Sequence, residues 1–131
     1  MKAILITIQS EYASMIYAGY KRIELRKQTP NVPIGTPCLN YEPLPIGRVT
    51  GYFTYAGTFE FNTLCINQSL LCDAGISYSK LRAYYESQVI GVAWRIKRAM
   101  IFLKTYKLTD FNVSRAPQSY CFVDIPDDFL I

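Results

Sequence analysis

Hydrophobic and polar positions follow two different periods along the chain, and each period predicts a different element. Residues 3–8 form a continuous apolar, β-branched run, which indicates a strand buried on both faces. In residues 10–18 the apolar side chains recur at helical spacing, and Gly19 follows as a natural stop. Residues 22–27 then alternate between apolar and charged side chains, as in a strand with one buried face.

The rest of the chain continues this mixture of strands and short helices. Further strands are predicted at residues 38–42, 48–61, 89–96 and 121–125, and another apolar stretch follows at 99–103. One short helix is predicted between a cap at Asn62 and a stop at Gly75, and another at 77–85. Gly51 and Gly57 suggest bends in the longest strand, as a closing barrel needs. About five or six strands with about three short helices predict a single α+β domain over residues 1–131, built as a small, partly open β-barrel.

Composition fits this expectation and excludes several classes of chemistry. Half of the 131 residues are hydrophobic and 18% are charged, which is typical of a globular chain. There is no histidine, so a Ser-His-Asp triad, a Cys-His pair and a His-ligated metal are excluded. The four cysteines form no CxxC pair, and neither a metal nor a cofactor is expected.

The chain is expected to be cytoplasmic. No apolar run is long enough for a membrane span, and no charged-then-apolar leader opens the sequence. We therefore expect no membrane association, with reduced and mostly buried thiols.

The net charge of +4 hides an uneven distribution. Residues 1–35 and 80–115 are basic, with net charges of +3 and +6, whereas residues 36–79 and 116–131 are acidic. Two basic blocks suit a phosphate-bearing partner. An ordinary solvated surface would show the same pattern.

The densest candidate site follows the first predicted helix. Lys21 stands at the start of a strand, and Glu24 and Arg26 project from one strand face about 7 Å apart. At the mouth of a barrel, Lys21 and Arg26 would hold a phosphate or carbonyl, and Glu24 would accept a hydrogen bond from a base edge. The spacing fits equally a charged face on an edge strand.

The same segment resembles the signature of the ASCH family of the PUA-like superfamily, in which a helix is followed by G-x-K-x-x-E-x-R. The matching positions here are Gly19, Lys21, Glu24 and Arg26. Two further segments resemble related phage and bacterial proteins, namely Tyr41-Glu42 with the following Val49, Gly51 and Phe53, and residues 115–123. With the Gly75-Ile-Ser helix start and the Ala93-Trp94 strand between these segments, the resemblance covers almost the whole chain.

The resemblance implies a small β-barrel flanked by helices, with a cleft beside the first helix and an association with RNA. Two branches of the family are enzymes, a ribonuclease and an amidohydrolase that removes acetyl from acetylated cytidine. Lys21 matches the catalytic lysine of the amidohydrolase, but Glu24 stands where that enzyme has threonine, so the hydroxyl for acyl chemistry is absent. Glu60 is the nearest match to its later glutamate.

Two other segments add candidates for the same cleft. Tyr41 and Glu42 offer a stacking ring and a carboxylate, unless Tyr41 packs in the core and Glu42 is simply solvated. Gln118 and Ser119 follow a proline in a loop, where they either read a base edge or stabilise the turn. Arg115 opens this loop as a further cation.

A second basic segment is the predicted backbone-phosphate patch. It contains Arg95, Lys97, Arg98 and Lys104. Contacts of this kind give affinity without reading sequence. Trp94 and the pair Tyr84 and Tyr85 are expected in the core.

Three functions follow from these candidates. The first is a binding module for RNA, another single-stranded nucleic acid or a nucleoside. The second is a small hydrolase, amidohydrolase-like or ribonuclease-like, in which Arg22 and Arg26 activate Lys21 and Glu24 acts as acid or base. The third is an accessory factor, such as a phage protein, that binds a protein partner through exposed tyrosines and arginines.

Overall fold

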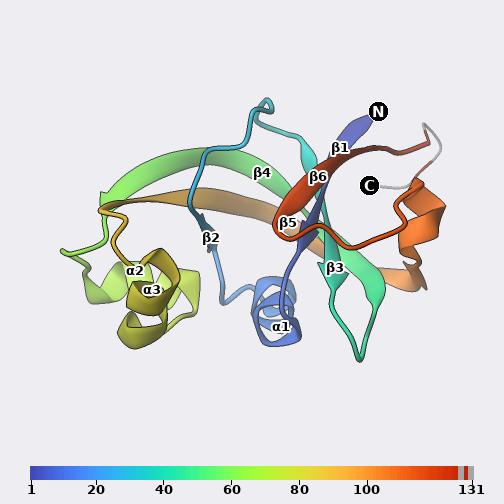
Figure 1. The fold of residues 1–131 in the computed structure, drawn as a ribbon. Helices are drawn as coiled ribbons and strands as arrows, with labels where there is room; N and C mark the ends of the chain where they lie inside the picture. The colour runs from blue at the N-terminus through green and yellow to red at the C-terminus, as the bar shows by residue number, and fades with distance from the viewer. Residues whose placement is uncertain (127–128, 130–131) are drawn as a thin grey trace.

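The computed structural model describes residues 1–126 and residue 129. Along the chain the elements are β1 (Lys2–Thr7), α1 (Ser10–Ala18), β2 (Ile23–Arg26), β3 (Pro37–Glu42), β4 (Arg48–Asn62), α2 (Gln68–Ala74), α3 (Tyr78–Tyr85), β5 (Ile90–Tyr106), a 3-10 turn (Leu108–Phe111) and β6 (Tyr120–Asp124). Figure 1 shows the long strands β4 and β5 arching across the molecule, with α1, α2 and α3 on the concave side of the arch.

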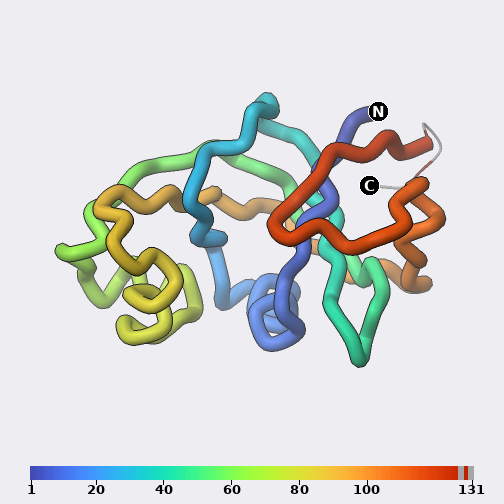
Figure 2. Tube along the Cα trace, viewed as in Figure 1, coloured from blue at the N-terminus to red at the C-terminus, as the bar shows by residue number. Residues whose placement is uncertain are grey.

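The strands form one six-stranded sheet in the order β2-β5-β4-β3-β1-β6. β1 pairs parallel with β3, and every other pair is antiparallel. β1 and β6 therefore lie side by side although they come from opposite ends of the chain, as the tube in Figure 2 shows. The expected α+β fold is confirmed.

The barrel is not confirmed, because the sheet is open. β2 and β6 are its two edges, and the described strands show no ladder between them. A side chain spans this gap instead: Arg26 of β2 donates to the carbonyl of Thr7 and to Oγ of Ser119, both at 3.0 Å. The opening between the two edges is where the candidate site lies.

The hydrophobic core lies on both faces of the sheet, and β1 explains why. Ile4 and Ile6 pack under α1 with Trp94, whereas Leu5 packs on the opposite face in a cluster that includes Phe111. These β1 side chains are fully buried, which confirms the strand predicted from the continuous apolar run. A third cluster lies under α2 and α3.

Two predictions of element boundaries were wrong. The helix expected from Asn62 begins only after Asn67, whose side chain accepts from the N–H of Leu70; Asn62 is still paired in β4. The strand expected at 89–96 does not end there: β5 continues to Tyr106 through bulges and a left-handed residue at Arg98 (φ 52°).

The cysteines are mostly outside the core. Cys38 is buried, but Cys65 and Cys72 are exposed, because they lie before and on the outer side of the short helix α2. Among the helices of the described chain, none has both the length and the apolar character needed to cross a membrane.

Candidate functional site

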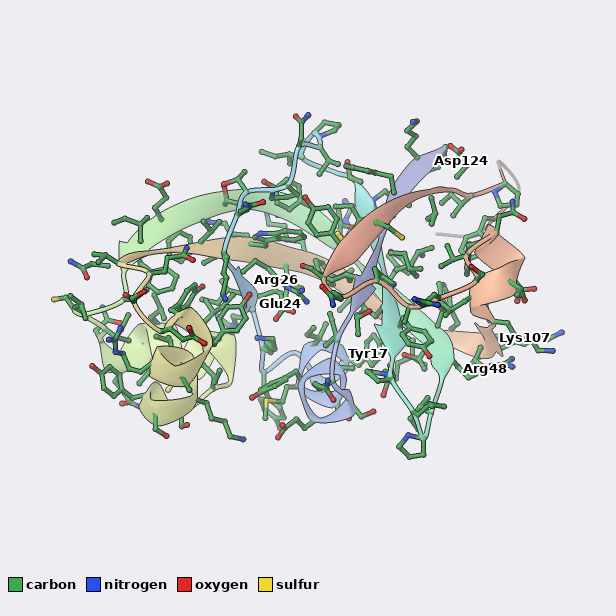
Figure 3. The ribbon with its side chains drawn as sticks, in the orientation of Figure 1. Tyr17, Glu24, Arg26, Arg48, Lys107 and Asp124 are labelled. Carbon is green, nitrogen blue, oxygen red and sulfur yellow. The ribbon has the colours of Figure 1, made fainter. Side chains whose placement is uncertain are left out.

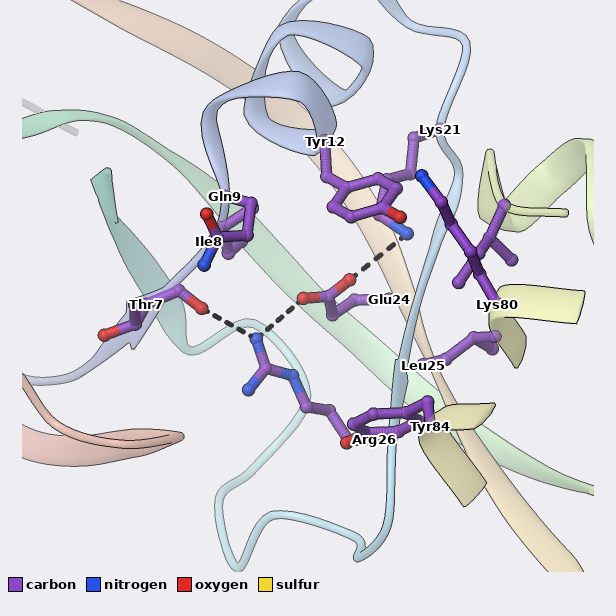
Figure 4. Close-up of a pocket in the computed structure, with 11 residues that line it drawn as sticks. Thr7, Ile8, Gln9, Tyr12, Lys21, Glu24, Leu25, Arg26, Lys80 and Tyr84 are labelled. Atoms are coloured by element: carbon purple, nitrogen blue, oxygen red, sulfur yellow. Dashed lines mark hydrogen bonds and ion pairs between the residues drawn. The ribbon is translucent and has the colours of Figure 1, made fainter. Parts of the chain in front are cut away.

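A pocket of about 370 Å³ opens between the end of β1, the start of α1, strand β2 and helix α3 (Figure 4). The residues that line it are Thr7, Ile8, Gln9, Tyr12, Lys21, Glu24, Leu25, Arg26, Ile76, Lys80 and Tyr84. Three of these side chains are cationic and one is a carboxylate. The pocket therefore combines apolar and aromatic walls with a concentrated set of charges.

Glu24 is the centre of a charged network on the floor of the pocket. One carboxylate oxygen lies 3.1 Å from Nζ of Lys21, and the other lies 2.7 Å from Nη2 of Arg26. The three side chains are only 4%, 10% and 12% exposed for Lys21, Glu24 and Arg26. The alternation of β2 predicted that Glu24 and Arg26 share a face, and Figures 3 and 4 show them pointing toward each other.

Lys21 reaches this position because the chain turns sharply at the end of α1. Gly19 takes a left-handed conformation (φ 86°) that ends α1, and the N–H of Lys21 then donates to Met15. The Lys21 ammonium donates to the carbonyl of Ala74 at 2.6 Å, at the last residue of α2. The negative end of a helix favours a cation there, so α2 and Glu24 together hold the ammonium.

The electrostatics of Glu24 follow from its two cationic neighbours. Burial by itself raises the pKa of this carboxyl, but the charges of Lys21 and Arg26 and their hydrogen bonds outweigh burial, and the pKa is lowered below its ordinary value of 4.5. Glu24 is therefore ionised at neutral pH. Its buried charge is tolerated because both oxygens face cations.

Arg26 is held from several sides. Besides Glu24, it donates to Thr7 and Ser119, while its Nε is buried and has no hydrogen-bond partner in the described part of the chain. Few buried N–H groups in proteins are left without an acceptor.

Two tyrosines stand on different sides of Glu24 in Figure 4, Tyr12 from α1 and Tyr84 from α3. The Lys21 ammonium lies 5.4 Å from the centre of the Tyr12 ring. Tyr84 is 38% exposed and packs edge-on against Tyr85, which is buried and donates to the carbonyl of Arg26 at 2.9 Å. The rings give the pocket flat apolar surfaces next to its charges.

The structure brings together the first group of predicted residues. Lys21, Glu24 and Arg26 share the pocket floor, and Ser119 joins them through Arg26. Gln118, exposed, precedes Ser119 in a loop that is fastened to β1, because Thr7 bonds to the carbonyls of Pro117 and Ser119. Arg115 is exposed in the same loop, outside the pocket lining.

Tyr41 and Glu42 do not share the cleft. Successive strand residues point to opposite faces, so Tyr41 packs in the core with Phe111 while Glu42 lies in a different pocket. There Glu42 accepts from Thr50, which also bonds to the hydroxyl of Tyr17 at 2.8 Å.

The basic residues of β5 also lie apart from the pocket lining. Arg95 donates to the carbonyl of Thr58 and lies 4.8 Å from the ring of Phe59, whereas Lys97 and Arg98 are exposed at the bulge. Glu60, considered as a later glutamate, is exposed on β4 and does not line the pocket.

The pocket residues that the sequence did not indicate include Gln9, Tyr12, Lys80 and Tyr84. Tyr12 and Tyr84 were assigned to buried helix stripes, since an aromatic ring at helical spacing is typical of a core. One signal was available: Lys80 and Tyr84 are four residues apart, which places them on one face of α3.

A metal centre finds no support in the donor set. Within residues 1–126 and 129, no three His, Cys, Asp or Glu side chains converge closely enough to hold an ion.

Comparisons with known proteins show where this fold occurs. No protein-family model matches the chain, and a search of curated protein sequences found no match. Among solved structures, a tyrosine-to-phenylalanine variant of ZmASCH from Zymomonas mobilis superposes with a TM-score of 0.82 at 19% identity, covering 95% of this chain and 91% of that one.

Two further structures support the same conclusion. The structure titled ASCH from Zymomonas mobilis gives a TM-score of 0.80 at 19% identity, with 93% and 87% coverage. A protein from Enterococcus faecalis gives 0.52 at 10% identity, covering 70% of this chain and 68% of that one. At these identities the likeness concerns the fold, and in the fold the expected ASCH resemblance is confirmed.

Proposed function

We propose that this chain, which has the fold of the ASCH protein from Zymomonas mobilis, binds RNA or another single-stranded nucleic acid by accepting one unstacked nucleotide in the pocket. One observation carries the proposal: the buried network of Lys21, Glu24 and Arg26 forms the floor of an open pocket. A pocket of about 370 Å³ is within the size range of small-molecule sites.

The available groups suit a nucleotide. Lys21 and Arg26 donate to phosphate or base carbonyl oxygens, and the unpaired lone pairs of Glu24 accept from an exocyclic amine. Tyr12 and Tyr84 offer ring faces on which a base can stack.

The surrounding loop and strand would extend this contact. Ser119 accepts a hydrogen bond from Arg26, and Gln118 precedes it in an exposed loop, so a hydroxyl and an amide would add polar contacts near the pocket. Arg115 on the same loop, and Arg95, Lys97 and Arg98 on β5, remain proposed phosphate contacts outside the pocket.

The arrangement favours binding over hydrolysis. Lys21 already donates to Glu24 and to Ala74, so its nitrogen is engaged by two acceptors and is not free to attack a substrate. The lowered pKa of Glu24 makes this group a poor proton donor near neutral pH. A hydrolase built on these two residues is the second candidate, because charged side chains converge on a pocket floor in active sites as well.

The proposal is tested by fluorescence anisotropy with a labelled single-stranded RNA and DNA of the same sequence, at several salt concentrations. We expect binding that weakens as salt rises. Glu24→Gln should weaken it at least about tenfold, since neutralising the carboxylate removes a charge-assisted acceptor and the partner of two cations.

Glu42→Gln is the matched control, because it makes the same change in a different pocket. It should leave the affinity unchanged in a protein of unchanged melting temperature. Absence of binding at low salt, or equal losses in the two variants, would contradict the proposal. RNA cleavage or deacetylation that disappears in Lys21→Ala would replace it with the hydrolase.

A further inference from the structure

We propose that the bound strand leaves the pocket across a rim formed by Lys27, Lys80 and Tyr84, with the ring of Tyr84 stacking on a base and the two lysines binding the adjacent phosphates. This inference rests on the proposed function. It assigns the phosphates next to the stacked base to the α3 side of the pocket, and leaves the basic segment of β5 to phosphates farther along the strand.

Tyr84 has the properties of a stacking surface. It lines the pocket and is 38% exposed, while Tyr85 packs edge-on against it with ring centres 4.8 Å apart and an interplanar angle of 73°. Tyr85 is itself fixed by its hydrogen bond to the carbonyl of Arg26. The Tyr84 ring is thus held at the pocket mouth by a buried neighbour.

Lys27 covers this ring in the free protein. Its ammonium lies 5.1 Å from the ring centre of Tyr84. An exposed cation–π contact is weaker than the stacking of a base on an aromatic side chain. A base would therefore displace Lys27 from the ring, and the released ammonium would lie next to the backbone of the same nucleotide.

Lys80 lies one helical turn before Tyr84 and lines the same pocket. Its ion pair with Glu11 is long, 3.9 Å, and both side chains are more than half exposed, at 60% and 57%. Exposed pairs of this kind contribute little, so a phosphate can replace Glu11 at small cost. Lys27 and Lys80 thus each place an ammonium near the Tyr84 ring, and each can exchange its present weak contact for a phosphate.

The basic segment of β5 has a different character. Arg95 is already engaged with the carbonyl of Thr58 and the ring of Phe59. Lys97 and Arg98 are exposed at a bulge, and neither lines the pocket. Their charges add to the general field, but the contacts that accompany a base lie on the α3 rim.

The test is the salt dependence of RNA binding. Each phosphate contact on a single strand contributes about 0.7 to the slope of log affinity against log salt. The double variant Lys27→Gln/Lys80→Gln should reduce the steepness of this salt dependence, with the magnitude of the slope falling by about 1.4. The matched pair Lys97→Gln/Lys104→Gln removes the same charge from β5. It should lower the magnitude of the slope by no more than about 0.7, because only Lys97 is a proposed phosphate contact.

A second pair of variants tests the ring. Tyr84→Leu should weaken RNA binding about 5- to 100-fold without changing the slope, and Tyr84→Phe should keep wild-type affinity because it keeps the ring. Tyr78→Leu is the control, since Tyr78 begins α3 and is 48% exposed but lines a different pocket.

Failure of this inference is distinguishable from failure of the proposed function. If the wild type binds RNA and Glu24→Gln weakens binding, but the slope responds to the β5 pair and not to the rim pair, only the rim is wrong. Equal effects of Tyr84→Leu and Tyr78→Leu would also overturn the rim. If the wild type binds no RNA at low salt, both proposals fail.

Discussion

Two stretches of alternating basic and apolar residues, 21–27 around β2 and 95–104 on β5, start side by side in the sheet, where Ile23 pairs with Arg95. In the first stretch, Lys21 and Arg26 turn inward onto Glu24 and are almost completely buried. In the second, Lys97 and Arg98 turn outward and are exposed. Similar charge patterns in sequence therefore acquire opposite environments.

The difference arises from what each strand faces. β2 is an edge strand whose charged face looks across the open side of the sheet toward α2 and the end of β1, where Ala74 and Thr7 supply carbonyl acceptors. β5 continues past β2 after Ile96 and bulges at Arg98. A basic segment forms a candidate site when carbonyl acceptors and a carboxylate surround its cations. The number of charges in the sequence does not show whether such partners are present.

The largest predicted effect is a difference in unfolding free energy between a variant in the first stretch and a variant in the second. Glu24→Ala leaves Lys21 and Arg26 buried without their carboxylate, which should cost about 3–5 kcal/mol of unfolding free energy. Lys97→Ala, on the exposed stretch, should change it by less than about 0.5 kcal/mol. Urea denaturation measures both, and equal effects would show that the inward network does not stabilise the fold.

The pH dependence of stability sharpens the same contrast. Because the folded pKa of Glu24 is lowered, its stabilising contribution is fully present above its ordinary pKa of 4.5 and is lost as the pH falls through the folded value. The difference in unfolding free energy between the wild type and Glu24→Gln should therefore shrink between pH 6 and pH 3. A difference that stays constant over this range would contradict the ionised state of Glu24.

Part of the site and of the fold could be predicted from local sequence patterns. Alternation in 22–27 identified Glu24 and Arg26 on one face, and the helix stop at Gly19 identified Lys21, because these relations depend on local geometry. The apolar run of β1 was equally informative, since a strand that is apolar on both faces needs cover on both, and β1 is packed on both faces in the structure.

Other features depend on tertiary structure and could not be predicted from the sequence. Tyr12 and Tyr84 come from helices far apart in the chain, and only their packing around β2 reveals that both reach one pocket. Tyr41 and Glu42 are neighbours in sequence but point to opposite faces of β3, so the resemblance could not place both in the cleft. The start of α2 was misplaced because Asn62 and Asn67 are both good caps, and pairing of Asn62 in β4 decides between them.

A smaller effect concerns how α3 holds β2 beneath the pocket. Tyr85→Phe removes the hydroxyl that donates to the carbonyl of Arg26 and should cost about 1 kcal/mol. Tyr84→Phe should cost nothing measurable, since no hydrogen bond of its hydroxyl is found among the described residues. Thermal unfolding of the two variants compares them, and equal losses would mean that the Tyr85 bond does not anchor β2.

The smallest effect is on the outward stretch. Arg98 has a left-handed backbone (φ 52°) that glycine adopts without strain, so Arg98→Gly should stabilise the fold by up to about 0.5 kcal/mol. Arg95→Gly, at a regularly paired strand position, should destabilise it. Chemical denaturation distinguishes the two, and destabilisation by both would show that the Arg98 side chain has a structural role.

The most direct test of the central claim, that the pocket around Glu24 is the ligand site, is amide chemical-shift mapping by NMR with nucleoside 5′-monophosphates. The account predicts saturable shifts at Gln9, Tyr12, Glu24, Lys80 and Tyr84, and their loss in Glu24→Gln but not in Glu42→Gln. Shifts confined to residues 97–104 of β5, or shifts in the pocket that persist unchanged in Glu24→Gln, would contradict it.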